Sequence, residues 1–318
     1  MPGYHCGMRK PEVSVVIVSD YSSTATRTWN DERKCLDAVA QQDFDGEVEI
    51  ILCEDAALRP TFPDDLFAKH LNARVLFTEA TDSYALKNAG VRAASAPIVA
   101  LLDADCRPSA NWLRLTVACF QANARVAVVN GRTYYDGTSI GERTLCLLTR
   151  AYIDPGHAGE TVFAGNNATG FRRETYLAHP LPEHLGPFAA RVQSESIRRA
   201  GGVLWFEPAI RVAHEFEGWS MEADIRRNIG YATIATRLSD SRLPYASLVR
   251  LGKLATPVIA AGKLLNAWRD CIRCARFYRI RPHEITYVFG AAIVVQAMEL
   301  RGMLAAYNGH AIGATSYR

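Results

Sequence analysis

Short apolar runs alternate with amphipathic stretches over the first third of the chain. Four runs are rich in β-branched residues and have the length of buried strands, at residues 13–19, 47–53, 73–78 and 98–102. The stretches between them have helical spacing, at about residues 29–41, 62–71 and 82–95. This alternation predicts an α/β fold, with a mainly parallel sheet flanked by helices on both faces.

Similar elements continue further along the chain, although less regularly. Residues 124–134 and 202–206 predict two more strands, and residues 191–200 predict a helix that ends at Gly201-Gly202. We therefore expect the sheet to extend beyond the four alternating strands.

The character of the chain changes after about residue 218. Residues 221–238 predict an amphipathic helix, which Pro244 follows. Residues 248–268 are apolar but contain three basic residues and Pro257, and residues 285–298 form a second apolar run. A membrane-spanning helix needs about 20 apolar residues, and neither run satisfies that requirement.

A dense basic stretch lies between these two apolar runs. Its arginines, interleaved with Phe277 and Tyr278, are Arg269, Arg273, Arg276, Arg279 and Arg281. One interpretation is a helical region packed on the preceding domain. The other is a pair of helices at an anionic membrane surface, with the arginines toward the lipid headgroups. The sequence leaves both open.

Composition narrows the class of protein without identifying it. The 318 residues, 49% hydrophobic and 22% charged, are enough to bury a sizeable core. A formal net charge of +3 is too small to indicate a nucleic-acid partner. Residues 1–10 contain a basic pair but no apolar run, so we expect no secretory signal. The predicted location is the cytoplasm. Peripheral binding to the inner face of the cell membrane is compatible with this prediction.

The eight cysteines are scattered, and several lie inside apolar runs, as buried free thiols do in a reducing compartment. Cys271-Ile-Arg-Cys274 has C-x-x-C spacing, but neither a second cysteine pair nor a histidine pair lies nearby in the sequence. We therefore do not expect zinc or redox chemistry there.

The strongest chemical signal follows the fourth strand. The apolar run at residues 98–102 leads directly into Asp103 and Asp105, and then into a turn. Ligands of open α/β sheets bind at the carboxyl ends of the strands, which is where these two acids are expected. Hard carboxylate oxygens suit a divalent ion that also takes oxygens from a diphosphate.

With its surroundings, this D-x-D segment resembles the family 2 glycosyltransferases, which are inverting enzymes with a GT-A fold that use nucleotide-sugars. The matching motifs, in chain order, are Val13-Ser-Val-Val-Ile-Val-Ser19-Asp20-Tyr21, Cys35-Leu36, Ala40-Gln-Gln-Asp-Phe44, Glu49-Ile-Ile-Leu-Cys-Glu54-Asp55, Tyr84-Ala-Leu-Lys87-Asn88-Ala-Gly90, Asn111-Trp112-Leu113, Phe163-Ala-Gly-Asn166-Asn167, Phe171-Arg172-Arg173, Ala200-Gly201, Phe206-Glu207-Pro208 and Val212-Ala-His214-Glu215. The resemblance covers roughly residues 11–217. It implies a tail at 1–10, a GT-A catalytic domain at 11–217 and a helical C-terminal region at 218–318.

The resemblance implies a metal site for Mn²⁺ or Mg²⁺. Asp105 is expected to bind the ion directly and His214 to supply a further ligand, while Asp103 lies close to the ribose or to a metal-bound water. Taken alone, His214 is more simply a hydrogen-bonded core histidine.

The resemblance also implies a nucleotide site. Asp55 is placed to accept the imide N–H of a uracil-like base, although an acidic turn after a strand is the simpler interpretation. Ser19, Asp20 and Tyr21 follow the first strand, where the family wraps the nucleoside, but the usual Pro-Thr-Tyr is absent. Lys87, beside Asn88, replaces an arginine that often stands there and can still bind a phosphate.

One departure from the family pattern concerns the general base. The aspartate expected before Ala200-Gly201 is replaced by Ala189-Ala190, and alanine cannot accept a proton. Glu195 is the nearest downstream acid, with Glu160 and Glu183 as alternatives. An ion pair from Glu195 to Arg191, Arg198 or Arg199, its helical neighbours, would remove it as a candidate.

From this sequence we predict a metal-dependent glycosyltransferase. It would move a single sugar, with inversion, from a UDP- or GDP-linked donor to an acceptor hydroxyl. The processive signature Gln-x-x-Arg-Trp is missing, since Glu217-Gly-Trp219 keeps only an aromatic residue. The C-terminal region would suit a lipid-linked or cell-envelope acceptor.

Two alternatives remain open at this point. One is a nucleotidyltransferase-like enzyme, although residues 19–28 lack the glycines of a phosphate loop. The other is a catalytically silent nucleotide-sugar-binding or assembly protein at the membrane, which the double alanine would favour.

Overall fold

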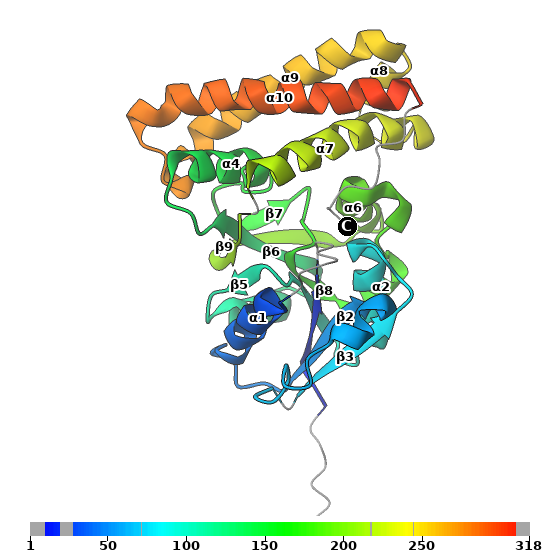
Figure 1. The fold of residues 1–318 in the computed structure, drawn as a ribbon, viewed down its shortest axis with the longest axis vertical. Helices are drawn as coiled ribbons and strands as arrows, with labels where there is room; N and C mark the ends of the chain where they lie inside the picture. The colour runs from blue at the N-terminus through cyan, green and yellow to red at the C-terminus, as the bar shows by residue number, and fades with distance from the viewer. Residues whose placement is uncertain (1–9, 20–27, 71, 217, 244, 310–318) are drawn as a thin grey trace, which may run out of the picture.

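The computed structural model describes residues 10–19, 28–70, 72–216, 218–243 and 245–309. Asp20, Tyr21 and Pro244, which entered the expectations above, lie outside these residues. Within them a nine-stranded sheet forms the centre, with helices on both faces, and a layer of long helices covers one end (Figure 1).

The alternating strands form one half of the sheet in the order β3-β2-β1-β4, all parallel. They are β1 (Val13–Val18), β2 (Val48–Asp55), β3 (Ala73–Thr78) and β4 (Ile98–Asp103). The helices α1 (Asn30–Ala40) and α2 (Ser83–Ala93) complete this half. In the register of the sheet Val18 pairs with both Cys53 and Asp103, so the polar ends of three strands meet at one edge.

The helix expected at residues 62–71 is wrong. A short 3₁₀ helix, η1 (Ala56–Thr61), precedes it, and turns follow at residues 64–69. Pro60 and Pro63 explain the difference, because proline lacks the N–H that a helix interior needs and disfavours helical geometry in the residue before it.

The other half of the sheet is mixed rather than parallel. Its strands are β5 (Cys106–Pro108), β6 (Val126–Tyr135), β7 (Gly159–Thr161), β8 (Ala168–Arg172) and β9 (Val203–His214). β8 runs antiparallel to β4 and β6, whereas β9 runs parallel to β6 and antiparallel to β5. β9 is longer than the predicted 202–206 and carries the chain to His214.

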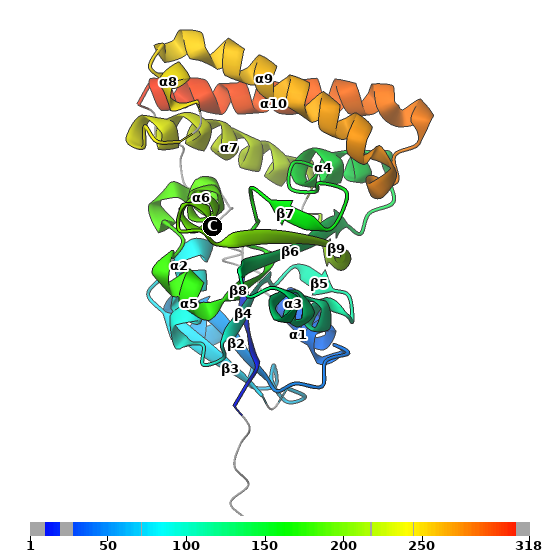
Figure 2. The ribbon, with the colours of Figure 1, turned by 180° about the vertical axis from the view of Figure 1, so that it is seen from behind.

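Helices on this half complete the layers. They are α3 (Trp112–Ala122), α4 (Ile140–Arg150), α5 (Arg173–Ala178), η2 (Glu183–Phe188) and α6 (Ala189–Arg199). Seen from behind, α3 and α5 lie over the near face of the sheet (Figure 2).

The core lies on both faces of the sheet, because successive side chains of a strand point to opposite faces. Val15 and Ile17 belong to one buried cluster and Val16 and Val18 to the other. Helix α2 packs against the second cluster so closely that a Cβ on Gly90 would lie 2.3 Å from Cγ1 of Val16. That approach fixes Lys87, on the same helix, over the carboxyl end of the sheet.

The C-terminal helices pack on one another as a separate layer. They are α7 (Trp219–Ser239), α8 (Ala246–Val249), α9 (Ala255–Cys274) and α10 (Ile285–Tyr307). The α7 and α10 backbones touch at Gly302, where a Cβ would lie 2.0 Å from the carbonyl oxygen of Arg227. Inside the layer Arg226 of α7 pairs with Glu222 (2.5 Å) and with Glu299 of α10 (3.3 Å).

The surface of this layer is partly apolar. Helix α9 exposes side chains at a spacing of about two turns, and these are Val258, Leu265 and Ile272. The segment Pro282–Tyr307 is long and apolar enough to cross a membrane, with 39% of its most apolar window buried. A core helix of a soluble protein can meet the same criteria, so the two interpretations of this region are not separated by hydropathy alone.

Candidate functional site

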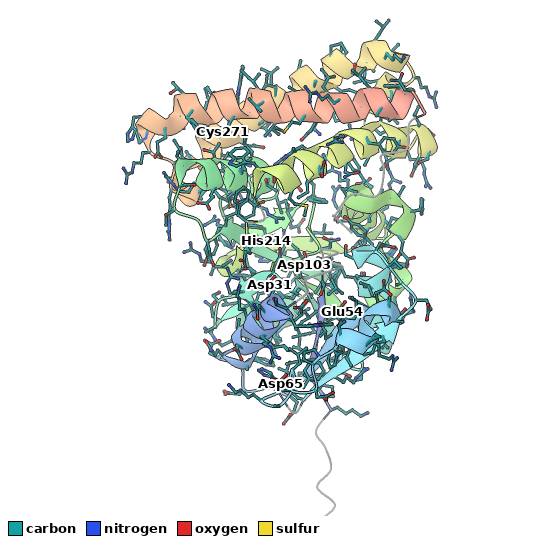
Figure 3. All side chains as sticks on the ribbon, in the orientation of Figure 1. Asp31, Glu54, Asp65, Asp103, His214 and Cys271 are labelled. Carbon is teal, nitrogen blue, oxygen red and sulfur yellow. The ribbon has the colours of Figure 1, made fainter. Side chains whose placement is uncertain are left out.

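Three strand ends bring together the acids of the D-x-D segment and His214. Asp103 is the last residue of β4, and Asp105 lies in the turn before β5. Pairing of β5 with β9 sets Cys106 opposite His214, and the backbone N–H of Glu215 donates to the carbonyl oxygen of Asp105 at 3.1 Å. Ligand atoms of Asp103, Asp105, Cys106 and His214 consequently lie within 4.8 Å of one another. Figure 3 labels Asp103 and His214 of this group, at the centre of the molecule.

His214 has the protonation state that a metal ligand needs. Burial, followed by the nearby charge of Arg150, lowers the pKa of its imidazole to about 3. Nδ1 lies 2.7 Å from the carbonyl oxygen of Glu215, which can only accept, so Nδ1 carries the proton. Nε2 is left with the lone pair, a partition typical of histidine ligands.

The donor set fits a hard divalent cation. Two carboxylates and a neutral imidazole are ligands that Mn²⁺ and Mg²⁺ accept. Burial, and then the charge of Asp105, raise the pKa of the Cys106 thiol well above its ordinary range, so this thiol stays protonated. Asp105 and His214, whose side chains approach within 3.4 Å of each other, are therefore the better ligands.

Lys87 joins this cluster from α2. Its Nζ lies 2.7 Å from Oδ1 of Asp103, and both side chains are almost fully buried. A buried ammonium beside a carboxylate at the metal cluster can also meet the oxygens of a diphosphate.

The remaining nucleotide-site candidates have structural contacts of their own. The Ser19 hydroxyl lies between Glu54 and Glu32, 2.7 Å from the latter. Oδ1 of Asp55 accepts the backbone N–H of Ala57 at 2.9 Å and so caps η1. Both residues lie at the predicted edge of the sheet, and their nucleotide contacts stay predictions.

Asn88 does not face the site. Its amide nitrogen donates to the Leu181 carbonyl oxygen (2.9 Å) and to Glu183 (2.8 Å), and its oxygen accepts from the Tyr176 hydroxyl (3.0 Å). These contacts tie α2 to the segment before α6 and use the hydrogen-bonding capacity of the amide. Asn88 therefore has a structural role, and the nucleotide contact expected for it stays a prediction.

A large cavity opens from the cluster toward the C-terminal layer. Its volume is about 710 Å³, and Lys87, Asp103 and His214 line one end. The walls beyond come from α4, α6, α7, α9 and α10, so residues from both ends of the chain enclose one space. This volume lies within the range of small-molecule sites.

Glu195 is removed as a candidate base by the criterion stated above. Its carboxylate pairs with Arg198 (3.2 Å) and Arg199 (3.0 Å), one helical turn away on α6. Ala190 lines the cavity instead, and Glu195 does not. Glu160 and Glu183, the alternative candidates for the base, are both exposed and do not line the cavity.

Sequence reasoning missed Arg150. It is the last residue of α4, lines the cavity, and lies close enough to His214 to lower the pKa of that imidazole. With the Asn167 amide oriented to satisfy its hydrogen bonds, its oxygen accepts from both terminal nitrogens of Arg150 at 3.1 Å. No motif marks Arg150; only the neighbouring Asn166-Asn167 was part of the resemblance.

The C-x-x-C pair is part of a hydrophobic cluster. Cys271 and Cys274 are buried free thiols that pack with Tyr278 and Val288. Burial raises the pKa of Cys271 to about 12, so this thiol is inert at neutral pH.

Comparison with protein families matches residues 25–179 to the family described as Glycosyl transferase family 2. A curated relative is Glycosyltransferase AglE of Haloferax volcanii, 30% identical over 118 residues. That match spans 35% of this chain and 38% of the relative, so it concerns a segment of each protein.

Two solved structures have a similar fold. The mannosyltransferase PcManGT from Pyrobaculum calidifontis, in complex with GDP-Man and Mn²⁺, has a TM-score of 0.61 at 17% identity, over 94% of this chain and 88% of that one. GalNAc-T7 with UDP, GalNAc and Mn²⁺ has a TM-score of 0.50 at 16% identity, over 75% of this chain and 52% of that one. The fold is thus the GT-A type that the sequence indicated, with a helical C-terminal region.

Proposed function

We propose, from the match of residues 25–179 to the family described as Glycosyl transferase family 2, that the chain transfers a single sugar from a nucleoside-diphosphate sugar to an acceptor. The observation that carries the proposal is the convergence of Asp103, Asp105 and His214 at the strand ends, beside the large cavity. Both similar structures hold a nucleotide or nucleotide-sugar together with Mn²⁺.

Asp105 and His214 would hold Mn²⁺ or Mg²⁺, with Asp103 beside them toward the ribose. A divalent ion supplies positive charge that neutralises the diphosphate as it leaves the sugar. Lys87 and Arg150 line the same end of the cavity and add fixed positive charge around the diphosphate. Ser19, Asp20, Tyr21 and Asp55 are assigned to the nucleoside; Asp20 and Tyr21 lie outside the described residues.

We assign a single in-line displacement at the anomeric carbon, which inverts its configuration. The chain lacks the Gln-x-x-Arg-Trp signature of processive relatives, which supports transfer of one sugar rather than synthesis of a polymer. A hydroxyl acceptor, as the sequence suggested, would need a base to remove its proton. The positions expected to supply that base are Ala189-Ala190 and Glu195, and neither offers a carboxylate to the cavity.

We also propose that the C-terminal layer rests on the inner face of the cell membrane. The apolar side chains exposed along α9 and the exposed arginines between α9 and α10 suit an anionic bilayer. The boundary between the catalytic and C-terminal regions is placed near residue 217, between β9 and α7.

A silent nucleotide-sugar-binding protein remains the second candidate, favoured by the alanines in place of the base. Both functions require donor binding, but only an enzyme turns the donor over.

Calorimetry with UDP and GDP, with and without Mn²⁺, tests the proposal. Asp105→Ala should abolish Mn²⁺-dependent binding and Asp103→Ala should weaken it, whereas Asp65→Ala, which removes an exposed carboxylate paired with Arg33, should change nothing. Unchanged Mn²⁺-dependent affinity in Asp105→Ala would refute the assignment. Hydrolysis of the sugar donor by the parent, absent in Asp105→Ala, would exclude the silent protein.

A further inference from the structure

The carboxylates that line the cavity are poor candidates for a general base. Among the described residues they are Asp103, Glu222, Asp270 and Glu299. Each forms an ion pair: Asp103 with Lys87, Glu222 and Glu299 with Arg226, and Asp270 with Arg273 at 3.2 Å. Pairing with a cation stabilises the ionised form of a carboxylate and so makes it a weaker proton acceptor. Burial raises the pKa of Asp270 in spite of its pairing, but this residue lies on α9, in the C-terminal layer rather than at the strand ends.

The cavity carries positive charge where the base is expected. Arg191 follows Ala189-Ala190 in the first turn of α6, which contains no acidic residue, and it lines the cavity. Arg237 of α7 lines the cavity as well, and burial and then the charge of Arg191 lower its pKa. An arginine whose charge is disfavoured by burial and by a neighbouring arginine belongs to a site that an anion stabilises.

Each of these two arginines lies over an aromatic ring. The guanidinium of Arg191 lies over the Phe163 ring, 5.7 Å from its centre. Arg237 lies over the Phe188 ring at 5.4 Å and donates to the Thr233 carbonyl oxygen at 2.9 Å. Nearby, Nδ2 of Asn166 and Nε of Arg150 are buried N–H groups without a hydrogen-bond partner among the described residues.

The remaining walls of the cavity are mainly apolar, although the paired side chains of Glu222, Arg226, Glu299 and Lys263 also contribute to them. The apolar side chains come from α7, α8, α9 and α10 and include Ile225, Ile229, Leu248, Ile259 and Val295. The cavity thus joins a cationic zone, formed by Arg191 and Arg237, to a mainly apolar zone inside the C-terminal layer. An amphipathic anion matches both zones.

We propose that the acceptor is a lipid monophosphate, whose phosphate oxygen attacks the sugar while its apolar chain lies between α7, α9 and α10. This inference rests on the proposed glycosyl transfer and names its acceptor class. Arg191 and Arg237 bind the phosphate, and the membrane surface supplies the lipid.

Such an acceptor removes the need for a general base. Above its second pKa of roughly 6 a phosphate monoester is already a dianion. Its oxygen forms a bond to the anomeric carbon with its own electron pair, while the bond from that carbon to the β-phosphate oxygen breaks and the nucleoside diphosphate leaves with those electrons. The product is a sugar phosphodiester. No proton is released, whereas a hydroxyl acceptor would release one for each sugar transferred.

The acceptor test uses the full chain with Mn²⁺ and a UDP- or GDP-sugar, at a pH about two units above that phosphate pKa. Decyl phosphate, ethyl phosphate, inorganic phosphate and decanol are compared by formation of glycosylated product and by proton release in weak buffer. We expect decyl phosphate to be glycosylated without proton release, at a KM far below that of ethyl phosphate, because each buried methylene strengthens binding roughly two- to fourfold. Equal use of inorganic phosphate would overturn the role of the apolar zone.

Variants test the arginines. Arg191→Gln and Arg237→Gln should each raise the KM for decyl phosphate by roughly 10- to 100-fold, since each removes a charged hydrogen bond. Arg198→Gln and Arg227→Gln, on the same two helices but exposed and paired with Glu195 and Asp224, should leave it unchanged. Binding of decyl phosphate, measured by thermal shift, should be weaker in Arg191→Gln and in Arg237→Gln than in the parent.

The outcomes separate this inference from the proposed function. Glycosylation of decanol with one proton released per turnover, and none of decyl phosphate, would overturn the acceptor class and leave glycosyl transfer intact. If the parent protein shows no Mn²⁺-dependent nucleotide binding, the donor site itself is refuted instead.

Discussion

The imidazole of His214 is held in its neutral form by burial, and this has a consequence for stability. Its pKa is about 3 in the fold, compared with an ordinary value near 6.5 in the unfolded chain. Between these values the unfolded state binds a proton that the folded state does not. The free energy of unfolding should therefore fall as the pH drops from about 6.5 toward 3.

We expect this loss to be about 1.4 kcal/mol per pH unit in the parent relative to His214→Gln. Urea unfolding in the presence of EDTA, at several pH values from 7.5 to 5, would measure it. Parallel pH profiles for the two proteins would mean that His214 is protonated within the fold and is not the neutral ligand described above.

Asp55 combines a structural contact with the predicted recognition of the base. Asparagine keeps an oxygen that can accept the Ala57 N–H, so Asp55→Asn should preserve the cap of η1 and the fold. Toward an imide N–H, however, it offers a weaker acceptor and a competing donor, so affinity for uridine or guanosine diphosphate should fall roughly 5- to 150-fold.

Calorimetry checks this prediction against Asp82→Asn. Asp82 has the same capping role at α2, where its Oδ1 accepts from Tyr84 and Ala85. If Asp55→Asn binds each nucleotide as the parent does, Asp55 serves only as a turn residue.

Among single residues, the sequence predicted those that belong to a linear motif. Asp103 and Asp105 follow a buried run, and Lys87 and His214 occupy family positions; all four lie around one end of the cavity. Arg150, Arg191 and Arg237 could not be predicted, because arginines on three helices converge only through packing. Asn88 belongs to a recognised motif, but its amide forms hydrogen bonds with neighbouring parts of the fold, which the motif did not predict.

At the scale of elements, the contact of α7 with α10 depends on the absence of a side chain. A Cβ on Gly302 would lie 2.0 Å from a main-chain oxygen of α7, so Gly302→Ala must separate the helices. We expect it to lower the free energy of unfolding by about 1–3 kcal/mol.

Gly290, on the same helix, provides the matched control because a Cβ there would meet nothing within 4 Å. Gly290→Ala should raise stability by up to about 1 kcal/mol through helix propensity alone. Urea denaturation of both variants measures the difference, and equal effects would show that the close approach does not constrain the layer.

Elements were predictable where periodicity and length agree. The four parallel strands fall within two residues of their predicted bounds, because buried β-branched runs have few alternatives. The direction of β8 and the full length of β9 were not predictable, since hydrophobic patterning carries no information on strand direction. Residues 62–71 have the apolar spacing of a helix, but Pro60 and Pro63 disfavour helical geometry there.

At the scale of the whole molecule, the C-terminal layer presents exposed apolar and basic side chains together. Reversing three exposed charges, in Arg269→Glu, Arg276→Glu and Arg279→Glu combined, should release the protein from anionic vesicles. Each basic residue near such a surface contributes about 1 kcal/mol, and reversal adds repulsion.

Co-sedimentation with vesicles of anionic lipid at low salt measures this. Arg33→Glu, Arg114→Glu and Arg173→Glu, which change the same number of charges on the sheet domain, should still co-sediment. Failure of the parent to bind such vesicles would favour the interpretation of the layer as a packed soluble subdomain.

The candidate metal ligands Asp105 and His214 are far apart in the sequence, with residues 106–213 between them. A ligand that bridges them binds the folded chain and has no such site in the unfolded one. At a hundred times its dissociation constant it would add about 2.7 kcal/mol to the free energy of unfolding. The concentration of the ion in the cell would then affect how long the protein stays folded, in addition to the rate at which it catalyses sugar transfer.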